Sequence, residues 1–207
     1  MSRPVKVLTI LLWVVAVTGM VSVVAVQLWS RDRQAQADEQ SVGDPIVAPE
    51  FSLTDQLGRP VTTQDLRGHA WIADFIFTEC ASACPIMSHN LASLQTRIPP
   101  DVKFVSFSVD PEHDTPPVLL AYAKQYGADN DRWRFLTGDK DTVMTAVHGM
   151  KVSIIPATQS SQIEHDIHFL LMDSAGRLHG VYDSRLPGEL DRLVSDSTEL
   201  AAQESKP

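Results

Sequence analysis

Cysteine is scarce in this chain: Cys80 and Cys84 are the only two cysteines among 207 residues. A closed zinc site usually pairs two cysteines with a second cysteine pair, or with two histidines that have about 3–5 residues between them, and neither is present. Basic residues are also in short supply, with 17 Lys and Arg against 26 Asp and Glu and a formal net charge of -9. Because nucleic-acid binding requires a basic face, the composition argues against a nucleic-acid partner.

Charge is absent from residues 7–26, "VLTILLWVVAVTGMVSVVAV". About twenty helical residues span about 30 Å, the thickness of a bilayer's hydrocarbon core, so we expect an uncleaved transmembrane anchor. A cleaved signal peptide is the alternative, but its apolar stretch is usually shorter, about 7–15 residues. The predicted organisation is a short cytoplasmic N-terminus, the anchor, a polar linker, one folded domain and a frayed tail, at 1–6, 7–26, 27–48, 49–202 and 203–207.

The folded domain alternates apolar runs with segments of helical spacing. Strands are expected within 50–63 (two, around a turn), 70–77, 102–110, 133–138, 168–173 and 178–183, and helices over 85–98, 115–127, 139–150 and 187–202. This order predicts an α/β fold with a mixed central sheet flanked by helices. The two cysteines fall where the first long strand leads into a helix. That carboxyl edge is where sites form in open α/β sheets.

Three interpretations compete for the cysteine pair in "FIFTECASACP" (75–85). A structural disulfide would close a very short loop, which contributes little stability. A closed zinc site lacks its second ligand pair. A working thiol pair, used for redox chemistry, soft-metal binding or both, fits best. A helix N-terminus favours the thiolate and lowers a thiol's pKa. Thiolates select Cu(I), and a nearby imidazole extends such a site to Cu(II).

Asp74 lies in the middle of an otherwise apolar strand, six positions before Cys80. A buried carboxylate is costly unless it is paired or protonated. The stretch "ADFIFTEC" resembles the thioredoxin pattern, in which a buried Asp at this spacing relays protons to the active cysteines. Asp74 is therefore a candidate proton relay, and a carboxylate held by a structural hydrogen bond is the alternative.

Several stretches, in order, resemble the Sco/SenC copper-chaperone family, which has a thioredoxin-like fold. They are "FSLTDQLGRPVTTQDLRG", "FTECASACP", "FSVDPEHDTPPVLLAYAKQYG", "WRFLTG" and "IEHDIHFLLMDSAGRL". Together they cover roughly residues 50 to 200. Two features depart from the family's usual residues: the loop "ASA" between the cysteines, and Asp166, which follows His165.

The resemblance implies that Cys80, Cys84 and one late histidine hold one copper ion per chain, as Cu(I) or Cu(II). The segment "EHDIH" offers His165 and His168. Counting back from the turn glycine, Gly176, selects His165, which follows the acidic Glu164. His168 would then be an ordinary sheet histidine. We therefore expect the metal ligands to be Cys80, Cys84 and His165.

The resemblance further implies a chaperone that delivers copper to the dinuclear copper centre of cytochrome c oxidase subunit II. A thiol reductase or a copper donor would be a further partner. The expected location is the bacterial inner membrane, crossed once, with the soluble domain in the periplasm. The alternative function is a metal-independent thiol–disulfide oxidoreductase, in which Cys80 and Cys84 form the redox pair and reduce partner cysteines.

Overall fold

The computed structural model describes residues 45–151 and 167–204. The chain divides into two compact units at Pro45/Ile46, and the fold described below belongs to the second. Within the described ranges no helix is long and apolar enough to span a membrane. The predicted anchor at 7–26 lies outside them.

A seven-stranded mixed sheet forms the centre of this unit, in the order β2-β1-β5-β4-β3-β6-β7. Strands β3, β4 and β5 run parallel to one another. Strand β1 pairs antiparallel with β2 and β5, and β6 pairs antiparallel with β3 and β7. The strands are β1 Ser52–Asp55, β2 Pro60–Thr62, β3 Trp71–Ile76, β4 Lys103–Ser108, β5 Trp133–Thr137, β6 His168–Met172 and β7 Leu178–Asp183. The predicted mixed sheet is confirmed.

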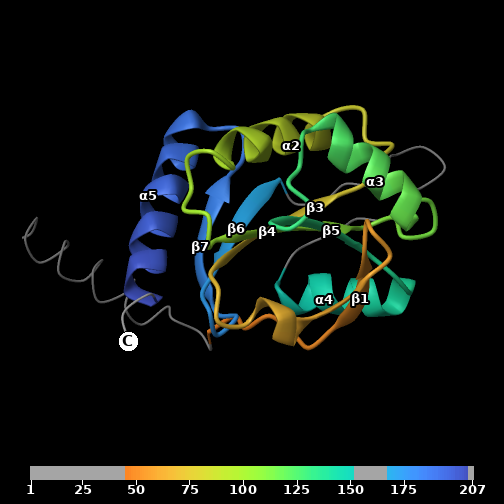
Figure 1. Cartoon of the computed structure of the whole chain (residues 1–207), viewed down its shortest axis with the longest axis horizontal. Coiled ribbons are helices and arrows are strands. Elements are labelled where there is room, and N and C mark those ends of the chain that lie inside the picture. The colour runs from red at the N-terminus through yellow and green to blue at the C-terminus, as the bar shows by residue number, and fades with distance from the viewer. Residues whose placement is uncertain (1–44, 152–166, 205–207) are drawn as a thin grey trace, which may run out of the picture. The chain divides into compact units, whose positions relative to one another are not determined.

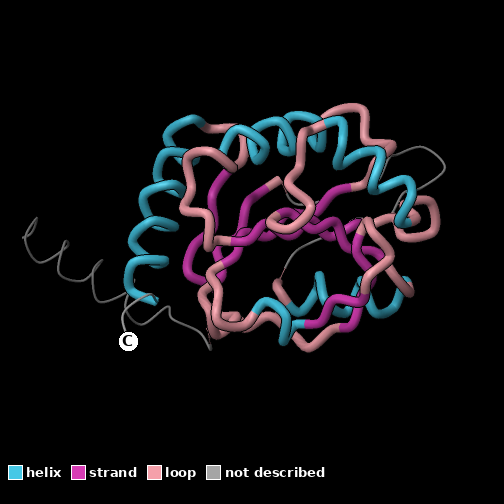
Figure 2. The backbone as a smooth tube through the Cα atoms, viewed as in Figure 1, coloured by secondary structure: helices cyan, strands magenta, loops and turns pink. Residues whose placement is uncertain are grey.

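Helices cover both faces of the sheet. Figure 1 shows α2 (Ala83–Leu94) and α3 (Pro116–Gln125) on one side and α4 (Lys140–Gly149) on the other. Helix α5 (Pro187–Glu204) lies beside β7, and a short 3-10 helix spans Thr63–Leu66. Figure 2 shows the same layers, with the strands in magenta between the cyan helices. The prediction of helices on both faces is confirmed.

The central strands are buried on both faces because helices lie above and below them. All six residues of β3 are buried, and β4 is buried from its second residue onward. Near-continuous apolar runs are typical of such parallel strands. The largest fully buried side chains include Trp71, Trp133 and Phe107. This packed core holds rigid the strand from which the cysteine loop emerges.

Several predicted boundaries shift in the structure. Residues 46–48, assigned to the linker, already pair with the β6–β7 turn through Leu178 N–H to Ile46 O and Ala48 N–H to Gly176 O, both 2.8 Å. Gln203, assigned to the frayed tail, is helical in α5. Both segments are held by contacts with the β6–β7 turn: Ala48 is buried against it, and Glu204 of α5 accepts the Ser174 N–H at 2.6 Å.

The helix expected over 85–98 begins earlier, at Ala83, and ends at Leu94. Its buried face is formed by Cys84, Met87, Ser88, Leu91 and Leu94. Ile86, which shares a helical spacing with the later leucines, is 52% exposed. The earlier start matters because it places Cys84 in the first turn of α2.

Candidate metal centre

The cysteines lie at the carboxyl edge of the sheet, between β3 and α2. Cys80 is in the connecting loop, and Cys84 is the second residue of α2. The backbone N–H of Cys80 donates to the Phe77 carbonyl at 3.2 Å, which closes a turn directly after the strand. The sequence prediction that the pair sits where the first long strand leads into a helix is confirmed.

The two cysteines contact each other through the sulfur of Cys80. The backbone N–H of Cys84 donates to Cys80 Sγ at 3.4 Å, and both cysteines are present as thiols. Cys80 is 8% exposed, whereas Cys84 is fully buried. Between them Ala81 and Ser82 are exposed. The pair therefore offers two adjacent sulfur ligands, of which the outer one, Cys80, is the one that solvent reaches.

Burial raises the pKa of the Cys84 thiol well above its ordinary value. A hydrogen bond from the Phe77 backbone lowers this pKa, and the neighbouring Cys80 and the charge of Asp74 raise it further. The expectation that the helix N-terminus lowers the thiol pKa is therefore wrong for Cys84, because desolvation outweighs the helix end. The raised pKa favours the protonated form of the Cys84 thiol.

Asp74 is fully buried in β3. Ser106, its register partner in the parallel strand β4, donates its hydroxyl to Asp74 Oδ1 at 2.5 Å. Trp133 Nε1–H in turn donates to Ser106 Oγ at 2.8 Å. The hydrogen bond expected under the alternative interpretation of Asp74 is present, and the charge of Asp74 also acts on the Cys84 thiol.

Sequence reasoning missed the polar partners that hold these groups. Asp74 and Ser106 are each polar residues within an apolar strand, and the two strands are neighbours in the sheet. A polar residue in each of two neighbouring buried strands could have indicated this hydrogen bond. Ser88, one turn after Cys84 on the buried face of α2, shares a 2.8 Å hydrogen bond with the Tyr122 hydroxyl of α3. This contact joins the two helices beside the cysteines, and burial raises the pKa of Tyr122.

The histidines differ in their burial and in whether they lie within the described residues. His165 lies outside the described residues, while His168 is the first residue of β6 and half-buried. His89, His148 and His179 are exposed. Across residues 45–151 and 167–204 no group of three or more His, Cys, Asp or Glu side chains could hold a metal ion. The described part of the chain therefore supplies the two sulfur ligands and no complete ligand set.

Residues 39–201 match the family model described as SCO1/SenC. The chain belongs to this family. A relative named "SCO1 protein homolog" from Bacillus subtilis (strain 168) is 33% identical over 165 residues, which cover 76% of this chain and 85% of the relative. The predicted family resemblance is confirmed.

Solved structures of Sco proteins share the fold. BsSco, described with a disulfide switch and as a member of the Sco family of cytochrome c oxidase assembly proteins, is 32% identical with a TM-score of 0.68, over 78% of this chain and 98% of that chain. Arabidopsis thaliana ScoI, solved with copper bound, is 27% identical with a TM-score of 0.64, over 72% and 97%. Copper is thus a ligand of Sco homologues.

Proposed function

We propose that this chain is a membrane-anchored copper chaperone, with Cys80 and Cys84 as the sulfur ligands of one copper ion. The observation that carries the proposal is the adjacent pair of free cysteines at the edge of the sheet, in which the backbone N–H of Cys84 donates to Cys80 Sγ at 3.4 Å. Two soft sulfur ligands suit Cu(I). A structural homologue with copper bound supports the same assignment.

His165 is the proposed third ligand. It precedes β6 closely in sequence, and β6 pairs antiparallel with β3, the strand that leads to the cysteines. An imidazole added to two thiolates allows the site to hold Cu(II) as well as Cu(I). His168, which lies within β6 opposite Asp183 of β7, is assigned an ordinary structural role in this proposal.

Loading of the site is linked to protons and to the redox state of the pair. Burial keeps the Cys84 thiol protonated, and a thiol must lose its proton to ligate a metal. Cys84 therefore gives up its proton as copper is bound and takes one back as copper leaves. Cys80 and Cys84 bind copper only in the reduced state, so a thiol reductase or a copper donor is the expected upstream partner.

The proposed recipient is the dinuclear copper centre of cytochrome c oxidase subunit II. The description of BsSco as one of a family of oxidase assembly proteins supports this direction of transfer. The proposed location is the bacterial inner membrane, with residues 7–26 as the anchor and the folded domain in the periplasm. The uncharged run in the sequence supports the anchor.

Transfer is tested with the full-length chain in mild detergent. The chain is loaded with Cu(I) without oxygen and mixed with the metal-free copper domain of subunit II, and copper is then measured on each protein after separation. We expect copper to move to the recipient from the wild type. His165→Ala should carry less copper than His168→Ala, its matched control. Loaded wild-type chain that leaves the recipient empty would refute delivery to subunit II.

A thiol–disulfide oxidoreductase is the second candidate function. It is favoured by the buried Asp74, whose charge acts on the Cys84 thiol, and by the disulfide switch described for BsSco. Under this proposal His165→Ala loses copper but reduces a partner disulfide at the wild-type rate. If the same substitution abolished thiol exchange, the metal-independent activity would be ruled out.

A further inference from the structure

Asp114 is a fully buried carboxylate that no part of the proposed copper site uses. It accepts hydrogen bonds from Thr78 Oγ1 at 2.5 Å and from Ser108 Oγ at 2.6 Å. The backbone N–H of Thr78 also points at its two oxygens, at 3.3 and 3.2 Å. Hydrogen bonds to a charged carboxylate are roughly twice as strong as neutral ones, so this cluster is a firm attachment.

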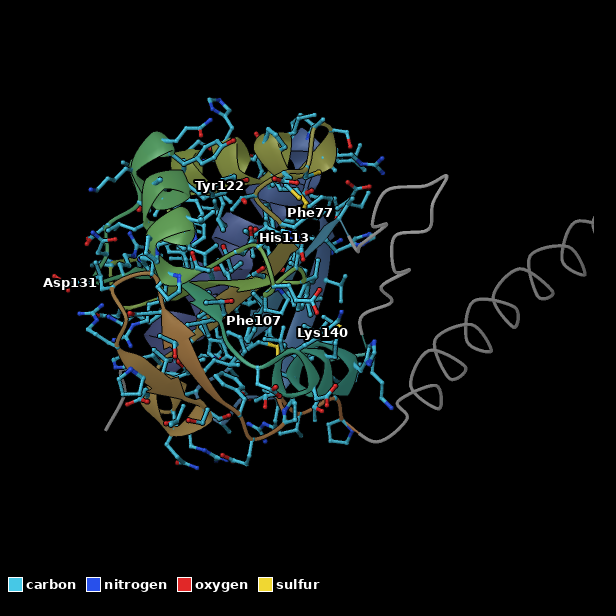
Figure 3. All side chains as sticks on the ribbon, turned by 90° about the vertical axis from the view of Figure 1, so that its right-hand side faces the viewer. Phe77, Phe107, His113, Tyr122, Asp131 and Lys140 are labelled. Atoms are coloured by element: carbon cyan, nitrogen blue, oxygen red, sulfur yellow. The ribbon has the colours of Figure 1, made fainter. Side chains whose placement is uncertain are left out.

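The cluster joins the loop that contains Cys80 to the end of β4 and to the segment before α3. Thr78 lies between the end of β3 and Cys80, Ser108 is the last residue of β4, and Asp114 precedes Thr115, the N-cap of α3. Ser108 Oγ also accepts the backbone N–H of Asp110 at 3.1 Å. In Figure 3 the labelled Phe77 and His113 mark the two loops that the Asp114–Thr78 contact connects.

Asp114 does not cap α3. The N-cap of that helix is Thr115, which makes no side-chain capping bond, and the hydrogen bonds of Asp114 go to Thr78 and Ser108. Asp114 therefore holds the neighbouring loop instead of the helix start. Without a capping role, the reason to bury a carboxylate here is the loop that carries Cys80.

The two cysteines are held in different ways. Cys84 is fixed by the first turn of α2 and by the core around it. Cys80 belongs to a loop whose next residues, Ala81 and Ser82, are exposed. The turn from Phe77 to Cys80 contains Thr78, so the bonds from Thr78 to Asp114 anchor the side of the pair that the helix does not hold.

We propose that Asp114 is a positioning residue for Cys80, which sets the outer thiol against Cys84 through Thr78. This inference rests on the proposed use of the pair as metal ligands or as a redox couple. Groups that orient metal ligands without touching the metal typically contribute about 10- to 100-fold to metal affinity or activity. We therefore expect Asp114→Asn to lower copper affinity within that range.

The matched control is Asp55, a second fully buried carboxylate. It accepts hydrogen bonds from the backbone N–H groups of Leu57 and Arg59 and from Arg59 Nε, all between 2.8 and 2.9 Å. These bonds close the β1–β2 turn, which is separate from the cysteine loop. Asp55→Asn thus removes a similar buried charge and lowers stability without touching the path from Asp114 to Cys80.

The experiment measures the alkylation rate of each cysteine separately, by mass spectrometry on the reduced full-length chain in detergent. Asp114→Asn should raise the rate at Cys80 severalfold, because the outer thiol becomes more accessible. Asp55→Asn should leave the alkylation rate of Cys80 at the wild-type value, even if it lowers the thermal unfolding midpoint as much as Asp114→Asn does. Equal Cys80 rates in the wild type and Asp114→Asn would overturn the proposal.

A second pair of variants covers the case in which Asp114→Asn does not fold. Thr78→Val removes the hydroxyl donor at nearly constant volume, and Thr78→Ser retains it. We expect faster alkylation of Cys80 in Thr78→Val and the wild-type rate in Thr78→Ser; equal rates in both would again overturn the proposal. The alkylation readout needs no copper, so a wild-type chain that retains none would refute the copper site and leave the role of Asp114 decided.

Discussion

Asp74 combines a structural bond with an electrostatic effect on the site. Its Oδ1 accepts the Ser106 hydroxyl at 2.5 Å, and its charge raises the pKa of Cys84. A carboxylate that only stabilised the sheet would act through Ser106, whereas a proton relay would act through its own ionisation. The two roles can be separated because the structural role depends on the Ser106 hydroxyl, whereas the relay depends on the Asp74 carboxylate.

Asp74→Asn should slow thiol–disulfide exchange more than it lowers stability, since the amide can still accept from Ser106 but cannot carry a proton to the thiols. Ser106→Ala is the control: it removes the hydrogen bonds of Ser106 with Asp74 and with Trp133, each of which contributes about 0.5–1.5 kcal/mol, and it leaves the carboxylate. Exchange is followed by stopped flow, and stability by urea unfolding. Wild-type exchange kinetics in Asp74→Asn would remove the relay.

His113 is an exposed histidine with a pH-dependent contact. Its Nδ1 lies 2.8 Å from Asp110 Oδ2, and the hydrogen bond and charge of Asp110 raise the pKa of His113 above its ordinary 6.5. A raised folded-state pKa contributes stability below the unfolded value that is lost as pH rises through the folded value. The His113–Asp110 contact therefore contributes its full stability to the fold below about pH 6.5, and this stability is lost as the pH rises through the folded-state pKa of His113.

An NMR titration of the His113 ring tests this contact. Asp110→Asn should move the midpoint of the titration to lower pH. Glu112→Gln should move the midpoint less, because Glu112 makes the smallest contribution to the raised pKa of His113. A midpoint that Asp110→Asn leaves in place would contradict the contact.

Helix α2 is the element on which the site depends, because its first turn contains Cys84. Its buried face packs into the core through Met87, Leu91 and Leu94, each fully buried. Met87 follows the cysteines closely and, as a sulfur residue, is an obvious candidate to shield a metal. Its complete burial in the core cluster instead indicates that it fills space beneath the helix.

Substitutions at Met87 distinguish these roles. Met87→Leu conserves volume and should cost less than about 1.5 kcal/mol, with unchanged copper per chain. Met87→Ala should cost about 2–5 kcal/mol because it leaves a cavity. Urea unfolding and copper analysis give the two numbers. Copper loss in a stable Met87→Leu chain would show that the thioether, and not packing, is what the site needs.

The elements of the fold were predictable because their patterns are strong. The uninterrupted apolar run of β3 and Asp139, which caps α4 by accepting Thr142 N–H at 3.1 Å, are both readable from sequence. The start of α2 was placed too late, because Pro85 is compatible with several positions in a first turn. The polar contacts of Asp114 join segments distant in sequence, and no local pattern encodes them.

The pKa of Cys84 shows what sequence could not decide. A thiol in the first turn of a helix is expected to ionise easily, and only the three-dimensional core reveals that Cys84 has no exposed surface. In contrast, the positions of Cys80 and Cys84 at the sheet edge followed directly from the order of strand and helix. The identity of the third ligand remains a prediction from sequence.

At the largest scale, the second unit of the chain is an α/β domain with its cysteine pair at one edge of the sheet. The parallel strands β3, β4 and β5 end there, and the loops after β3 and β4 are tied together by Asp114. The sheet supplies rigidity, the start of α2 supplies one sulfur and the loop supplies the other. Membership of the SCO1/SenC family agrees with a copper-handling role for this arrangement.

The most direct test counts copper on the reduced full-length chain. The chain is loaded with Cu(I) without oxygen, desalted and analysed for copper per protein, together with Cys80→Ser, Cys84→Ser, His165→Ala and His168→Ala. We predict about one copper per wild-type and His168→Ala chain, as a two-sulfur, one-imidazole site implies, and clear loss in the other three. A wild-type chain that retains no copper, with both thiols intact, would contradict the copper site.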